Sequence, residues 1–87
     1  MIPTLQSLEK TCIACPAQWE RTLSDGAFFY VRYRNGILSI GFGATPDAAV
    51  EDRRFEWALG DALDGWMEWD QASDYFDLAV LAHYRGD

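Results

Sequence analysis

Residues 55–77 contain no lysine or arginine, although they carry seven carboxylates. The first 54 residues hold six acidic and six basic side chains, so the net charge of −7 lies entirely in the last third of the chain. Nucleic acids and anionic membranes repel carboxylates, which disfavours both as direct ligands. The charge distribution favours a basic protein as the partner.

The sequence also lacks a long apolar run. No stretch approaches the roughly 20 residues that a membrane-spanning helix needs. The N-terminus has no basic region followed by an apolar run, as a signal peptide would have. We therefore expect a cytoplasmic protein with reduced thiols, in the cytoplasm of the host cell if a phage encodes it.

Side chains typical of catalysis are scarce. His83 is the only histidine, and there is no nucleophile motif such as G-x-S-x-G that would give a general base its partner. The glycines near residues 41–43 lack the rest of a dinucleotide or phosphate-loop motif, and residues 60–71 fail the calcium-loop pattern. We expect no enzyme, no cofactor and no metal site, with His83 at the surface or at the edge of the core.

Two cysteines form a C-x-x-C pair, Cys12 and Cys15. Such a pair is found in thiol redox sites and as half of a zinc site, but zinc needs four ligands and redox chemistry usually needs a helix N-terminus. Two small apolar side chains packed under a sheet edge are the structural alternative. A small metal- or redox-responsive module therefore stays open as one interpretation.

The composition predicts one globular domain over residues 1–87. Apolar residues make up 49% of the chain and thirteen residues are aromatic, which argues strongly against a disordered protein. Alternating patterns predict strands over residues 17–23, 27–34 and 37–42. Asn35-Gly36 predicts a tight hairpin turn, because a type I′ turn needs positive φ at both central residues. The strict alternation of residues 54–59 favours a fourth strand over the alternative, a helix that continues from Pro46 to Gly60.

Two helices are predicted. Thr45 is a favourable N-cap with Pro46 in the first helical position, and about two turns should follow. Asp70 is expected to cap a last helix that runs to about Tyr84. Residues 1–11 are expected to form an entry segment with a helical turn over residues 7–10. The fold class is therefore α+β, with an antiparallel sheet of three to four strands packed against one or two helices.

The acidic stretch is the candidate functional region. On a helix that starts at Asp70, residues 74 and 77 follow at i+4 and i+7, so three carboxylates share one face. Aromatic residues among the acids would supply anchors of the kind that interfaces concentrate. The candidate partner-binding residues are Glu56, Asp61, Asp64, Glu68, Asp70, Asp74, Asp77, Trp66, Trp69 and Tyr75.

In its small size, strong acidity and lack of catalytic motifs, the chain resembles the anti-CRISPR inhibitors of phages that mimic DNA. Three stretches, residues 15–20, 25–26 and 30–36, are also similar to small uncharacterised proteins of phages and bacteria. The first resemblance implies an inhibitor whose target is the DNA-binding surface of a CRISPR effector complex. We expect the chain to be a monomer. An immunity or antitoxin protein that neutralises a basic nuclease is the alternative with the same electrostatics.

Overall fold

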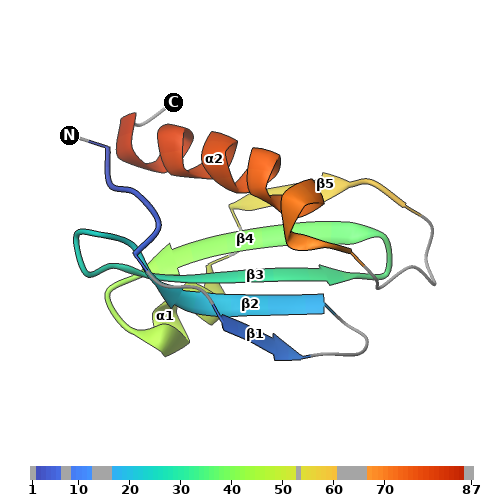
Figure 1. Cartoon of the computed structure of the whole chain (residues 1–87), viewed down its shortest axis with the longest axis horizontal. Coiled ribbons are helices and arrows are strands. Elements are labelled where there is room, and N and C mark those ends of the chain that lie inside the picture. Colours follow the sequence, from blue (N-terminus) through green and yellow to red (C-terminus); the bar gives the residue numbers. More distant parts are fainter. Residues whose placement is uncertain (1, 7–8, 13–16, 53, 61–66, 86–87) are drawn as a thin grey trace.

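The computed structural model describes residues 2–6, 9–12, 17–52, 54–60 and 67–85, which form one antiparallel sheet and two helices (Figure 1). The strands follow one another in chain order across the sheet. They are β1 (Glu9–Cys12), β2 (Ala17–Thr22), β3 (Phe28–Arg34), β4 (Ile37–Gly43) and β5 (Phe55–Ala58), and the helices are α1 (Pro46–Glu51) and α2 (Trp69–Arg85). The α+β prediction is confirmed.

The central meander follows the sequence pattern closely. Strands β2, β3 and β4 pair as consecutive hairpins, and the β3–β4 turn has φ of 56° at Asn35 and 75° at Gly36. These positive values are those that a type I′ turn requires. The predicted fourth strand is β5, which pairs with β4.

The N-terminal prediction is wrong. Instead of a helical turn over residues 7–10, Glu9 and Lys10 lie in β1 and pair with β2, with a register shift before Cys12. Residues 7 and 8 lie outside the described part. β1 adds an edge strand to the four that the alternation predicted. Its sequence, EKTC, carries no apolar alternation, so only its pairing with β2 identifies it as a strand.

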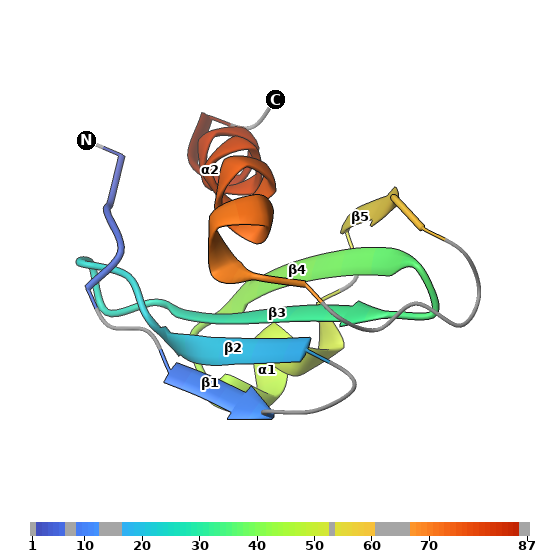
Figure 2. The ribbon, with the colours of Figure 1, turned by 45° about the vertical axis from the view of Figure 1, so that its right-hand side comes forward.

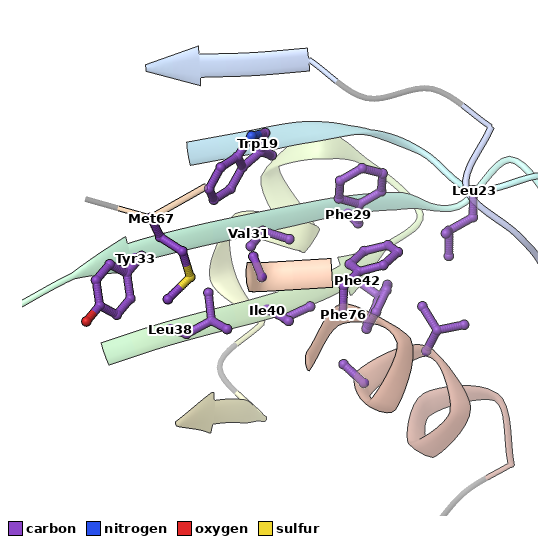
Figure 3. Packing of buried hydrophobic residues seen from close by; sticks show 13 residues of the cluster. Trp19, Leu23, Phe29, Val31, Tyr33, Leu38, Ile40, Phe42, Met67 and Phe76 are labelled. Carbon is purple, nitrogen blue, oxygen red and sulfur yellow. The ribbon is translucent and has the colours of Figure 1, made fainter. Parts of the chain in front are cut away.

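One face of the sheet carries the core, and α2 covers that face while α1 lies against the other (Figures 1 and 2). Alternate residues of β3 and β4 point toward α2, as the strand period of two requires. Figure 3 shows how the aromatic and branched side chains of the sheet meet the helix. The core residues are Trp19, Leu23, Phe29, Val31, Tyr33, Leu38, Ile40, Phe42, Met67, Ala72, Phe76, Ala79 and Val80.

Phe76 is the large aromatic residue of α2 that is buried against the sheet. Its ring meets Phe29 edge-on at a centroid distance of 4.9 Å, and Trp69 and Phe42 lie at 5.4 and 6.1 Å. Aromatic pairs at these distances add to the free energy gained from burial. Phe76 therefore fixes which side of α2 faces the sheet.

Helix α1 begins as predicted, because the Thr45 side chain accepts a hydrogen bond from the backbone N–H of Ala48 and Pro46 is the first helical residue. The helix lies tightly against β4. A Cβ at position 41 would meet the backbone oxygens of Ala49 and Asp52, so only glycine lets the helix approach this closely.

Helix α2 begins two residues earlier than expected from a cap at Asp70. Its first residue is Trp69, and the backbone N–H of Ala72 donates to the carbonyl oxygen of Glu68 at 3.2 Å. The Gln71 side chain in turn accepts from the N–H of Glu68 at 3.0 Å. The capping position is thus Glu68 and not Asp70, and the Gln71 side chain that reaches back to the Glu68 N–H supplies one of the two contacts of a capping box.

Replacing Phe76 with alanine tests the packing of α2. The substitution leaves a cavity among three aromatic rings and should lower the free energy of unfolding by about 3–5 kcal/mol, measured by urea unfolding with tryptophan fluorescence. Leu78→Ala is the matched control, because Leu78 is 55% exposed on the same helix and its truncation should change stability by less than about 0.5 kcal/mol. Similar losses in both variants would contradict this orientation of α2.

Candidate functional site

Three carboxylates of α2, those of Asp70, Asp74 and Asp77, form what we call the acidic helix face. Residues at i, i+4 and i+7 lie on one side of a helix, and all three side chains are exposed. Glu68, which precedes the helix, is exposed as well. The opposite side of α2 is buried against the sheet, so the acidic helix face points into solvent.

The acidic helix face has no basic partner within the part of the chain that the structure describes. The ion pair seen there joins Arg54 to Asp52, and the Arg54 side chain also contacts α2 at His83, six residues after Asp77. Glu68 and Asp70 lie where the helix dipole favours negative charge, which accounts for part of the pattern. Asp74 and Asp77 lie beyond the first turn, where that benefit fades.

The candidate aromatic anchors are partly used by the fold. Trp69 is half-buried, with its ring 5.4 Å from that of Trp19, and Tyr75 is half-buried with its ring 5.2 Å from that of Trp57. Both side chains therefore help to attach α2 to β2 and β5. Only their outer parts are available to a partner.

Glu56 does not join the acidic helix face, contrary to the expectation of one surface from Glu56 to Asp77. Its neighbours Phe55 and Trp57 point toward the core, so Glu56 points to the other face of the sheet, where Ser39 Oγ donates to its Oε2 at 3.0 Å. It shares a hollow of about 230 Å³ with two basic residues, Arg32 and Arg34. Strand alternation alone places Glu56 there.

Three further candidates, Asp61, Asp64 and Trp66, lie outside the described residues. So do Cys15 and the side chain of Cys12, which leaves the C-x-x-C interpretation without a structural test. Among the residues that are described, no three histidine, cysteine or acidic side chains gather as a metal site would require.

A polar cluster that the sequence did not predict joins the end of α1, β4 and α2. Arg54 donates to both carboxylate oxygens of Asp52, at 2.9 and 3.0 Å, and its Nη2 lies 2.7 Å from His83 Nδ1. Asp52 also accepts from the backbone N–H of Phe42 at 3.0 Å. Because arginine only donates, Nδ1 accepts and the His83 proton resides on Nε2.

These contacts shift the protonation equilibria of the cluster. The hydrogen bonds from Arg54 are the main reason why the pKa of Asp52 falls to about 2. Burial, and then the positive charge of Arg54, lower the pKa of His83. The imidazole stacks on Phe42 at 4.8 Å and is half-buried, as expected for a histidine at the edge of the core.

A second polar contact holds the C-terminal part of α2. The Tyr84 hydroxyl donates to Asp25 Oδ2 at 2.7 Å, and burial together with this bond raises the pKa of Tyr84 to about 12. Asp25 also accepts from the N–H of Ala27 in the β2–β3 turn, and this bond is the largest cause of its lowered pKa. The side chains of the polar cluster bond to one another, and so do those of Tyr84 and Asp25. These hydrogen bonds therefore attach α2 to the elements beside it.

Comparison of the chain with protein-family models, with curated proteins and with solved structures found no match. None of the described helices has the length and apolar character to cross a bilayer.

The polar cluster predicts how stability depends on pH. Unfolding returns the pKa of Asp52 to about 3.8, so its contribution of about 2 kcal/mol is present above pH 4 and is lost as the pH falls toward 2. His83, whose pKa is lowered in the fold, adds an earlier loss below about pH 6.5. Urea unfolding of the wild type from pH 8 to 2 should show both losses.

Asp52→Ala should reduce the acid-dependent loss below pH 4, leaving the part that comes from Asp25, whose pKa is also lowered in the fold. It should lower stability at pH 7 by about 2 kcal/mol, because it also leaves the Phe42 N–H unpaired. Glu51→Ala is the control, since Glu51 is exposed at the end of α1, next to Asp52. A loss between pH 4 and 2 that is as large in Asp52→Ala as in the wild type would refute this assignment.

Proposed function

We propose that the chain is a non-enzymatic inhibitor that places the acidic helix face on a basic, nucleic-acid-binding surface of a partner protein. The observation that supports this proposal is the exposed row of Asp70, Asp74 and Asp77, without a neutralising cation among the described residues. The proposal concerns these three residues together with Glu68, and it leaves out Glu56, which lies on the other face of the sheet.

The spacing of the row fits a surface that binds a phosphate backbone. From Asp70 to Asp77 the helix rises about 10 Å, at 1.5 Å per residue. One strand of DNA carries about three phosphates over a similar length, at 3.4 Å per nucleotide. A groove lined by lysine and arginine would meet a comparable number of negative charges, and the long-range attraction would speed association.

The class of target follows from the resemblance to anti-CRISPR inhibitors together with this charge spacing. A CRISPR effector holds nucleic acid in a positively charged channel that recognises backbone geometry and not sequence. An acidic helix on a small, rigid sheet can enter such a channel and exclude DNA without any chemical step. This proposal accounts for the acidic helix face without requiring a catalytic group.

The direct test is competition with DNA for purified guide-loaded CRISPR effector complexes, measured by fluorescence anisotropy at several salt concentrations. The wild-type chain should displace the DNA, and its affinity should weaken as salt rises. The variant Asp70→Asn/Asp74→Asn/Asp77→Asn should lose about tenfold or more in affinity and show a shallower salt dependence, because the three charges act at the contact.

A second triple variant, Asp47→Asn/Glu51→Gln/Glu56→Gln, is the matched control. It removes the same total charge from α1 and from the opposite side of β5, all at exposed side chains. Its affinity should stay within about threefold of the wild type. Equal weakening by the two triple variants would show that only net charge matters, and displacement that neither variant changes would refute the proposal. If a basic nuclease and no CRISPR effector is inhibited, the target class is wrong.

A further inference from the structure

An apolar groove runs between α2 and the N-terminal segment, residues 2–5. Its volume is about 340 Å³. Most of its lining side chains are apolar, and the polar ones are Thr4, Ser73 and Asp77. The apolar lining residues are Ile2, Pro3, Leu5, Trp69, Phe76, Val80 and Leu81.

The N-terminal segment is a fixed wall of this groove. The N–H of Thr4 donates to Ser24 Oγ at 2.9 Å, and the N–H of Ser24 donates to the Thr4 carbonyl at 2.7 Å. A bridge between Leu5 and Leu23 continues this attachment. Figures 1 and 2 show the segment rising from the sheet beside α2. The groove therefore exists before any partner binds, which reduces the entropy lost on binding.

The rim of the groove leaves apolar side chains in water. Leu5 is 40% exposed and Leu81 is 37% exposed, one on each wall. Exposed leucines scattered singly need no explanation, but these two line the same hollow. Covering them together with the groove floor would remove further apolar surface from water, and this favours an apolar occupant.

The negative charge beside the groove indicates which kind of occupant fits it. Asp77 lines the groove and also belongs to the acidic helix face, and none of the described lining residues is basic. A side chain that enters the groove thus passes a carboxylate, with Asp70 and Asp74 on the same side of the helix. An apolar side chain flanked by lysine or arginine fits both features, whereas a free fatty acid or another anion would meet repulsion.

We infer that the groove holds an apolar anchor, one or two leucine- or phenylalanine-sized side chains, from a lysine- and arginine-rich segment of the partner protein. The volume lies at the lower end of the range for ligand sites, about 300–1,000 Å³, which suits side chains. An apolar anchor at the centre of a contact with a polar rim is a common arrangement in protein interfaces. The inference rests on the proposed function, because the acidic helix face supplies the attraction for the basic flanks.

Two labelled peptides of about twelve residues serve as probes. Both consist mainly of lysine and arginine, one with leucine and phenylalanine at its centre and the other with two serines there. Fluorescence anisotropy should show that the wild-type chain binds the first peptide about tenfold or more tightly, since burying one such side chain is worth about that factor. Equal binding of the two peptides, or no binding of either, would overturn the inference.

Leu81→Ser and Leu78→Ser form a matched pair of variants on the same helix. Leu81 lines the groove, whereas Leu78 is more exposed and does not line it. Leu81→Ser should weaken binding of the apolar-centred peptide about fivefold or more and leave the salt dependence unchanged, while Leu78→Ser should change affinity by less than about twofold. Thermal melts of both variants confirm that each is folded.

The same assay separates this inference from the proposed function. If neutralising Asp70, Asp74 and Asp77 weakens both peptides but the two leucine variants behave alike, the groove inference fails and the acidic helix face stands. If the charge variant binds both peptides as well as the wild type does, the proposed function fails. Sedimentation of the wild type and of Leu81→Ser adds one outcome: a dimer that Leu81→Ser dissociates would assign the groove to a second copy of this chain and overturn the inference.

Discussion

The packing of the Phe76 ring against Phe29, Phe42 and Trp69 is the contact on which the rest of the structure depends. It fixes the rotation of α2 about its own axis, because a ring this large fits the sheet in one orientation only. Once Phe76 points inward, helix geometry places the acidic helix face outward. The exposure of the carboxylates is thus a consequence of how the core is packed.

Polar contacts at the other end of α2 make that orientation rigid. His83 meets Arg54, and Tyr84 meets Asp25, so the C-terminal turns are attached to residues far away in the sequence. Aromatic packing holds the N-terminal turns, where Trp69 lies on Trp19. A helix fixed at both ends loses little conformational entropy when a partner binds, so weak charge contacts along its middle count more fully toward affinity.

Local signals predicted the meander and both helices, because Asn35-Gly36 and Thr45-Pro46 act through their own backbone geometry. The sequence failed where long-range pairing decides the outcome. The sequence of β1 shows no strand pattern, and the segment is a strand because it pairs with β2. Arg54 contacts His83, which is 29 residues away in the sequence. The groove likewise joins residues 2–5 to α2, and no local window contains both. The prediction placed Glu56 on the acidic surface for its charge alone. The alternation of side chains along β5 turns it to the other face of the sheet.

The acidic helix face can be explained by stability only in part. The helix dipole favours Glu68 and Asp70 at the start of α2, and this benefit falls off within the first turn. Asp74 and Asp77 gain little from it, and each repels its neighbour by a few tenths of a kcal/mol. That cost is too small to prevent folding, yet a surface shaped by stability alone would mix both signs of charge. At Asp74 and Asp77, stability alone does not favour a carboxylate, whereas binding to a basic partner does. Asp77 also lines the apolar groove.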